Sequence, residues 1–309
     1  MSKDTDAPTG PHPAGGGGPL PLVTVIVPVF NGQATLPALL ESLAAQDYRR
    51  DRLQVLIADD ASTDRTLALL EPHRGTMEIV RQPVNGGSYA ARNAALSRAR
   101  GEVLAFTDAD CRPDADWVSS GVRALQAQGS GLVAGAVAIE PVDRRSAVQR
   151  YDQAFGIQQA FFARRQRFGA TANLFVDRRV LDKVPGFDER LRSGGDKAFC
   201  DASAAAGLPF SYAPDCRVRH APRKSLRELA VKQARVAVGH VRIFPCWSRY
   251  RLVPLSTMPG ESFDHAAFSR EPDAWFRWRF RALYYGLELV YLASYARGCL
   301  GLSLERTLR

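Results

Sequence analysis

Short apolar runs rich in valine, isoleucine and leucine alternate with segments of helical periodicity over the first 140 residues of the chain. In the helical segments, apolar residues recur every three or four positions, a spacing that gathers them on one face of a helix. This alternation predicts a parallel sheet whose strands are joined by crossover helices. The expected strands are residues 22–30, 54–58, 77–81, 103–107 and 132–139, and the expected helices are residues 35–46, 64–73 and 88–98.

The second half of the chain has a different pattern. Residues 146–219 mix a long helix with a strand at 172–176 and a helix at 196–206. The last part is expected to contain a basic amphipathic helix, a loop-like stretch and a helix rich in aromatic residues and arginine, at residues 226–241, 245–272 and 273–302.

These patterns divide the chain into one main domain with two appendages. Residues 1–20 are polar and glycine-rich without an apolar core, so we expect a disordered lead and not a signal peptide. Residues 21–242 are long enough for one α/β domain, with halves at 21–140 and 141–242. Residues 243–309 then form a C-terminal loop and helix.

The chain carries a formal net charge of +9, with a sequence pI near 9.6. Such a charge favours a negatively charged partner, which is a nucleic acid, a phosphorylated ligand or an anionic membrane surface. The sequence has neither zinc-finger spacing nor a basic region that runs into heptads. Its five cysteines are scattered without a CxxC pair, so they indicate neither a disulfide framework nor a structural zinc site and fit a reducing cytoplasm.

Polar clusters follow three of the expected strands, at residues 31–32, 59–60 and 108–110. Ligands bind at the carboxyl ends of the strands in an open parallel sheet, so we expect these clusters on one rim. Asp108 and Asp110 are costly to crowd together without a cation, and hard divalent ions such as Mg²⁺ bind such oxygens together with phosphate. An aspartate-rich turn without a metal is the alternative.

The region between residues 59 and 88 contains two further candidates. Thr63 or Asp64 is a suitable N-cap for the next helix, whereas the paired aspartates at 59–60 have no such structural role. A carboxylate there can accept the N–H of a pyrimidine base. Residues 85–88 place two glycines before an alanine-rich helix. The free N–H groups of such a loop can bind a phosphate, and the alternative is that the loop is only a capped turn.

Four motifs follow one another in the first 110 residues: Val25 to Gly32, Asp59 to Asp64, Asn85 to Asn93 and Asp108 to Asp110. In this order they resemble the family 2 glycosyltransferases, and the resemblance continues to near residue 240. It implies the GT-A fold, a nucleotide-binding α/β fold with a central, mostly parallel sheet flanked by helices. Here the fold would carry a C-terminal helical extension.

The resemblance also implies roles for residues in the donor site. Pro28 and Phe30 would line the nucleotide pocket, and Asp60 would contact the base. Asn93 lies in the helix expected at residues 88–98, before the fourth strand, and resembles the family position that helps to hold the donor. Asp108 would lie on the sugar or ribose.

A metal site is implied at Asp110, with Asp108 and His220 as further ligands and Mg²⁺ or Mn²⁺ as the cofactor. Asp110 resembles the second aspartate of the family's DxD motif. His220 resembles a histidine that follows the last strand and reaches the metal or the diphosphate. A purely structural histidine is the alternative.

On the acceptor side, residues 169–175 and 186–189 look like the family's acceptor-side strand and the turn after it. Residues 194–200 resemble its Glu-Asp catalytic motif, with Gly195 in place of the glutamate. The aspartate remains as Asp196, and the resemblance makes it the general base. An N-cap for the helix that follows is the alternative role.

The resemblance implies transfer, with inversion at the anomeric carbon, of a sugar from a nucleotide donor to an acceptor hydroxyl. UDP is the expected nucleotide, because it is the commonest in the family. The acceptor would be a glycan or a lipid-linked molecule, in the synthesis of cell-surface polysaccharide or glycolipid. Residues 233–237 do not match the Gln-x-x-Arg-Trp motif of processive synthases, so we expect one sugar per transfer.

Other functions fit the sequence less well. A sugar-phosphate nucleotidyltransferase would carry a glycine-rich basic loop after the first strand, and a dehydrogenase would carry GxGxxG there. Residues 28–32 match neither. A non-catalytic nucleic-acid or membrane-binding module leaves the acidic rim unexplained, because carboxylates repel phosphate unless a metal lies between them. No nucleic acid partner is therefore expected.

The helix at 273–302 carries aromatic residues beside arginines, and Glu288 interrupts its apolar stretch, so it is too short for a comfortable bilayer span. Such a helix suits a headgroup interface, and the alternatives are packing on the main domain or a dimer contact. The interfacial interpretation predicts a cytoplasmic protein that is peripheral at the inner face of the plasma membrane.

Overall fold

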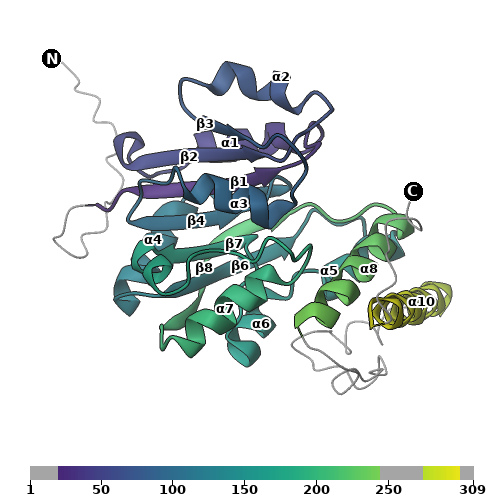
Figure 1. The fold of residues 1–309 in the computed structure, drawn as a ribbon. Coiled ribbons are helices and arrows are strands. Elements are labelled where there is room, and N and C mark those ends of the chain that lie inside the picture. Colours follow the sequence, from purple (N-terminus) through teal and green to yellow (C-terminus); the bar gives the residue numbers. More distant parts are fainter. Residues whose placement is uncertain (1–19, 244–273, 300–309) are drawn as a thin grey trace, which may run out of the picture.

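The computed structural model describes residues 20–243 and 274–299 (Figure 1). The lead predicted for residues 1–20 and the loop predicted for residues 245–272 lie outside the described residues, apart from Leu20. The boundaries expected at residues 140 and 242 stay predictions.

A single eight-stranded sheet forms the centre of the molecule, in the order β3-β2-β1-β4-β7-β6-β8-β5. Most neighbouring strands are parallel, whereas β7 runs antiparallel to β4 and β6, and β5 runs antiparallel to β8. The strands are β1 (Val23–Val29), β2 (Leu53–Asp59), β3 (Glu78–Arg81), β4 (Val103–Thr107), β5 (Cys111–Pro113), β6 (Leu132–Ile139), β7 (Asn173–Asp177) and β8 (Phe210–His220).

Helices cover both faces of the sheet (Figure 1). On β1, Val25 and Val27 belong to the core shared with α1 and α4, whereas Ile26 belongs to the core shared with α3 and α7. Because both faces are covered, every residue of β1 is buried, which explains its nearly continuous apolar sequence. The α-helices are α1 (Leu36–Ala44), α2 (Thr66–Leu70), α3 (Ser88–Leu96), α4 (Trp117–Gln128), α5 (Ala147–Phe155), α6 (Gln159–Gln166), α7 (Gly195–Ala205), α8 (Leu226–Ile243) and α10 (Ala274–Cys299), and short 3₁₀ turns occur at Arg50–Arg52, Glu71–His73 and Arg178–Asp182.

This architecture is the α/β fold expected from the sequence, with a mostly parallel sheet between helices. The long helix expected after residue 146 is instead two helices, α5 and α6. They separate near Gly156, whose φ of −71° and ψ of −117° lie outside the helical region. The sequence pattern does not predict β5 or β8, because β5 has three residues and the first six residues of β8 are exposed or half-buried.

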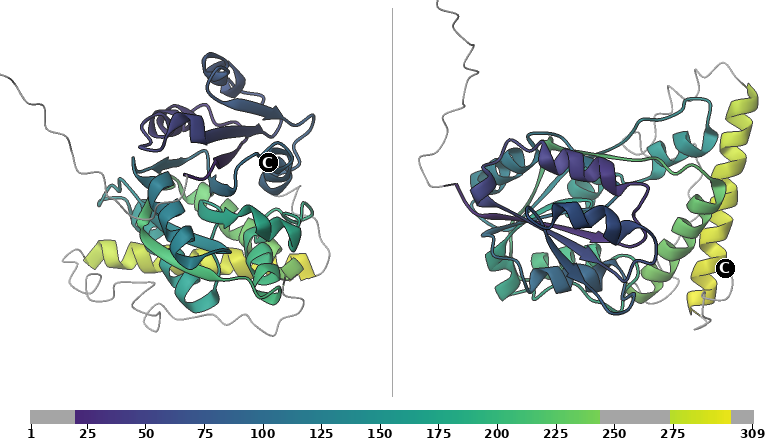
Figure 2. Two further views of the ribbon diagram at one scale, coloured as in Figure 1. Left: turned by 90° about the vertical axis from the view of Figure 1, so that its left-hand side faces the viewer. Right: turned by 90° about the horizontal axis from the view of Figure 1, so that it is seen from above.

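The C-terminal helix α10 lies along α8 and α5 at one end of the molecule (Figure 2). Its inner face is buried against residues of α5 and α8, so the helix packs on the main domain. Its outer face exposes four large side chains, Trp275, Trp278, Tyr285 and Leu289. In the two segments that the structure describes, no helix is both long enough and apolar enough to cross a membrane.

Candidate active site

The polar residues that follow the strands meet at one rim of the sheet. Asp59 ends β2, and Asp108 comes directly after β4, which is parallel to the same central strand. At the edge of the sheet opposite β3, Cys111 of β5 pairs with His220 of β8. This pairing places Asp110, the residue before Cys111, beside the histidine.

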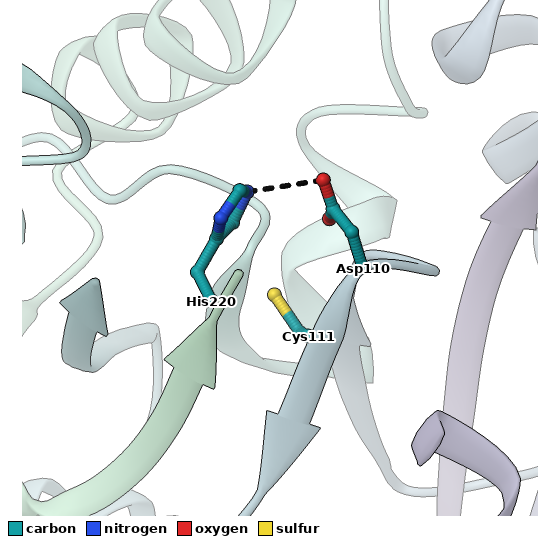
Figure 3. Close-up of side chains that lie close together, drawn as sticks. All are labelled: Asp110, Cys111 and His220. Carbon is teal, nitrogen blue, oxygen red and sulfur yellow. Dashed lines mark ion pairs between the residues drawn. The ribbon is translucent and has the colours of Figure 1, made fainter. Parts of the chain in front are cut away.

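Asp110 and His220 form an ion pair, with 3.2 Å between the carboxylate Oδ2 and the imidazole Nε2 (Figure 3). The other ring nitrogen, Nδ1, lies 2.8 Å from the carbonyl oxygen of Ala221, so Nδ1 is the nitrogen that keeps its proton. Burial works against both charges, but the attraction between the two groups outweighs it. The pKa of His220 is therefore raised, and the pKa of Asp110 is lowered.

This pair fits a divalent cation. The candidate ligand atoms of Asp110, Cys111 and His220 lie within 4.8 Å of one another. A carboxylate oxygen and an imidazole nitrogen suit Mn²⁺, and a metal-bound histidine usually donates its second N–H to a carbonyl, as His220 does to Ala221. Burial raises the pKa of the Cys111 thiol, whose Sγ lies 3.9 Å from the carbonyl oxygen of Ala172. The thiol therefore stays protonated, and Asp110 and His220 are the better ligands.

Asp108 is held by a residue to which the sequence analysis gives no role. Arg92 of α3 is only 3% exposed, and its guanidinium donates to the Asp108 carboxylate. The same guanidinium lies 5.6 Å from the ring centre of Tyr89, and its Nε has no hydrogen-bond partner among the described residues. The missed signal is the position of Arg92 on the face of α3 that also buries Ala91 and Ala95, because arginine is rarely buried without a partner.

Asp196 lies in the first turn of α7, and the N-cap of that helix is Gly194. The alternative role of Asp196 as the N-cap is therefore not what the structure shows. Its Oδ1 accepts from the backbone N–H of Lys197 at 3.0 Å and from the Tyr89 hydroxyl at 3.3 Å, and its Oδ2 lies 3.4 Å from the backbone N of Thr171. Burial raises the pKa of Asp196, and the nearby Arg92 partly offsets that rise.

The Asp60 carboxylate is already bound within the protein. It accepts from the backbone N–H groups of Gly86 and Gly87, each at 2.8 Å. The two glycine N–H groups are thus bound within the protein, whereas α3 itself has no side-chain N-cap, so both alternatives for this loop stay predictions. The neighbouring Asp59 is fully buried, and its Oδ2 has no hydrogen-bond partner in the described part of the chain, although Arg81 Nε lies 3.6 Å away. The role of Asp60 at the base stays a prediction, and Asp59 offers a second carboxylate there.

The three remaining donor-site candidates lie in different surroundings. Pro28 is buried within β1, and Phe30 is 50% exposed just beyond its end. The Asn93 side chain donates to the Phe187 carbonyl at 2.8 Å and to Glu189 at 2.9 Å, and accepts from the Phe187 N–H at 2.9 Å. These bonds tie α3 to the turn after β7. The donor-binding roles of all three residues stay predictions.

A second charged cluster, which the sequence pattern does not predict, lies around Arg223 in the segment after β8. Asp152 of α5 is fully buried and accepts from Arg223 Nη1 at 2.9 Å and from Lys232 Nζ at 3.3 Å. It also accepts from the backbone N–H of Arg223 at 3.0 Å. Asp152 therefore fastens the segment after β8 to α5 and α8.

Comparisons with known proteins agree with this architecture. A model of the family described as Glycosyl transferase family 2 matches residues 24–185. Glycosyltransferase AglE of Haloferax volcanii is 32% identical over 228 residues, which cover 73% of this chain and 75% of the relative.

Two solved structures share the fold. The mannosyltransferase PcManGT from Pyrobaculum calidifontis, in complex with GDP-Man and Mn²⁺, has a TM-score of 0.57 at 24% identity and covers 94% of this chain and 82% of its own. Residues 1–349 of Staphylococcus aureus TarS, in complex with UDP-GlcNAc, have a TM-score of 0.54 at 20% identity and cover 92% of this chain and 93% of their own. The GT-A fold expected from the sequence is thus confirmed, and the chain belongs to glycosyltransferase family 2.

Proposed function

We propose that the protein is a metal-dependent, inverting glycosyltransferase that moves one sugar at a time from a nucleotide donor to an acceptor hydroxyl. The observation that carries the proposal is a continuous set of charges on one rim. His220 pairs with Asp110, and Arg92 binds Asp108. Arg92 also lies on the ring of Tyr89, whose hydroxyl contacts Asp196. The rim thus combines a place for a cation with a separate carboxylate base.

Asp196 is the general base that takes the proton of the acceptor hydroxyl. Burial raises its pKa, and a carboxylate with a raised pKa is a stronger proton acceptor. Arg92 opposes this rise, because its positive charge favours the ionised carboxylate. Arg92 also fixes Asp108, so donor-side and acceptor-side groups share one buried cation.

Asp110 and His220 would hold Mg²⁺ or Mn²⁺, with Asp108 beside them. When bound, the ion neutralises the negative charge that develops on the departing diphosphate. The protein prepares this position by orienting His220 through its Nδ1 contact with Ala221, so that Nε2 and the Asp110 carboxylate face the same point. The cation would replace the proton that the two groups share.

We assign a UDP-sugar as the donor. The complex of TarS with UDP-GlcNAc supports UDP, and the complex of PcManGT with GDP-Man makes GDP the alternative. Phe30 is exposed at the end of β1, where a ring can stack on a base, and Asp59 and Asp60 lie on the neighbouring strand end. The acceptor is a glycan or a lipid-linked molecule, in surface polysaccharide or glycolipid synthesis at the inner face of the membrane.

Contact with the membrane would use the outer face of α10. Positions 275, 278, 285 and 289 follow one another at spacings of three, seven and four, which keep them on one side of the helix. Two tryptophans, a tyrosine and a leucine on that side, next to the exposed Arg279, suit the headgroup region of an anionic bilayer. The inner face is occupied by α5 and α8, so docking would leave the fold unchanged.

Release of the nucleoside diphosphate, UDP or GDP, from a panel of nucleotide sugars that includes UDP-GlcNAc and GDP-Man tests the main proposal. Asp196→Asn should lower turnover about a hundredfold or more, while UDP binding in the presence of Mn²⁺ stays unchanged in calorimetry. Asp201→Asn is the matched control, because Asp201 is an exposed aspartate of the same helix that pairs with Lys197. Near wild-type turnover in a folded Asp196→Asn variant would exclude this residue as the base.

Vesicle flotation tests the membrane contact without disturbing the fold. The double variant Trp275→Ala/Trp278→Ala should bind anionic vesicles at least about tenfold more weakly than the wild type, because two large interfacial side chains are lost. Leu226→Ala, at another exposed apolar residue, should bind normally. Equal binding of all three proteins would contradict the contact.

A further inference from the structure

Gly195 stands directly before the proposed base, and its missing side chain has a reason in the packing. A Cβ atom at this position would lie 2.7 Å from Cε2, 2.9 Å from Cδ2 and 2.9 Å from Cζ of Tyr89. Gly195 has no positive φ, unlike Gly194 before it, whose φ is +81°. A glycine at 195 is therefore required because the Tyr89 ring occupies the space of a side chain, and not because of the backbone conformation.

Tyr89 reaches this place from α3, far away in the sequence. Its ring is 6% exposed, stacks on Phe187 with 5.7 Å between ring centres, and lies under the Arg92 guanidinium. Burial, together with the charge of Asp196, raises the pKa of the Tyr89 phenol. The phenol therefore keeps its proton and can only donate to Asp196.

The contacts of the Asp196 carboxylate are unequal. Oδ1 accepts from two donors, the Tyr89 hydroxyl at 3.3 Å and the Lys197 N–H at 3.0 Å. Oδ2 has one long contact, 3.4 Å from the Thr171 nitrogen. Oδ2 is thus the oxygen with capacity for the proton of a substrate. A distance of 3.3 Å is long for a hydroxyl donor, and such catalytic hydrogen bonds shorten when substrate binds.

We infer that Tyr89 is the positioning residue for Asp196: its phenol holds Oδ1 and leaves Oδ2 for the acceptor hydroxyl, and Gly195 is present because the tyrosine ring occupies the space of a side chain there. The inference rests on the proposed function of Asp196 as the base. The base is then oriented by a residue of α3, the helix that also carries Arg92, and not by the residue next to Asp196 in the chain.

Tyr89→Phe tests the hydroxyl while keeping the ring and its stacking on Phe187. Turnover of the fastest UDP-sugar of the panel should fall about tenfold, with its KM changed by less than about twofold. The lost hydrogen bond stabilised the ionised carboxylate, so the pKa of Asp196 should rise further and the acid limb of the turnover profile should move to higher pH by about half a unit to one unit. Tyr48→Phe is the matched control, because Tyr48 is equally buried and its hydroxyl donates to the Pro21 carbonyl at 2.7 Å. It should leave the pH profile unchanged.

Gly195→Ala tests the ring. In the wild type the new methyl group must displace Tyr89, so the melting temperature and the turnover should both fall. In a Tyr89→Ala background the methyl group has room, and Gly195→Ala should cost no further stability, because alanine is the better helix former. This double-mutant cycle reads the packing directly and does not depend on substrate.

The possible outcomes separate the two proposals. An inactive Asp196→Asn variant together with a Tyr89→Phe variant of normal turnover and normal pH profile would overturn the role of Tyr89 and leave the base assignment standing. Additive effects of Gly195→Ala and Tyr89→Ala on melting temperature would overturn the explanation of Gly195. An active Asp196→Asn variant, or no hydrolysis of any nucleotide sugar, would remove the proposed function and this inference with it.

Discussion

Asp110 and Asp152 both bind the chain around the end of β8, yet their surroundings are opposite. Asp152 is fully buried and has two cationic partners, Arg223 and Lys232. Asp110 is 40% exposed, and its ion pair is with His220, whose charge is an exchangeable proton. A fully buried carboxylate between two cationic side chains holds the fold together. A partly exposed carboxylate paired with a single histidine leaves room for a metal ion.

The largest expected effect is on turnover, and it is expected for Asp110 and not for Asp152. Asp110→Asn should lower turnover of the nucleotide sugar about a thousandfold and abolish Mn²⁺-dependent UDP binding in calorimetry, because an amide is a much weaker ligand for a hard cation. Excess EDTA should have the same effect on the wild type and none on the variant. Asp114→Asn is the control on the same edge of the sheet, since Asp114 is a half-buried aspartate whose partner, Arg219, is exposed and is not among the candidate metal ligands. Full activity in EDTA would show that Asp110 has no metal to hold.

The second prediction is for stability. Asp152→Asn should lower the free energy of unfolding by about 3–5 kcal/mol, because it leaves two buried cations without their carboxylate. Turnover per folded molecule should change little. Asp51→Asn breaks an exposed pair with Arg49 and should change stability in urea unfolding far less, because solvent screens an exposed pair. A loss at Asp152 as small as the loss at Asp51 would mean that the cluster does not fasten the segment.

The sequence predicts one of these clusters and not the other for a physical reason. Asp110 belongs to a short motif at the end of a strand, and strand ends in a parallel sheet share one rim, so local pattern is enough to find it. Asp152 contacts Arg223 across 71 residues, and nothing near Asp152 in the chain distinguishes it from a surface aspartate. Tyr89 and Asp196 are likewise 107 residues apart.

The fold shows the same limit. Strands buried on both faces, such as β1, and crossover helices such as α1 repeat patterns that a single sequence reveals. In contrast, β5 has only three residues and forms a strand because they pair with β8. Its prediction requires the rest of the sheet. Residues that act through partners from distant elements, such as Arg92, are missed for the same reason.

The smallest expected effect is on the pH dependence of stability, because Asp152 is one carboxylate with two cationic partners. Burial, and next the neighbouring Arg223, lower the pKa of Lys232 from 10.5 to about 8, although Asp152 opposes this shift. Between pH 8 and 10.5 the folded state has lost this proton while the unfolded state keeps it, so Lys232 makes stability rise with pH in that window. The free energy of unfolding of the wild type should therefore gain about 1–2 kcal/mol between pH 8 and 10 relative to Lys232→Met, in which this titration is absent. Parallel pH profiles of the two proteins would mean that Lys232 titrates normally, and that Asp152 balances both of its cations.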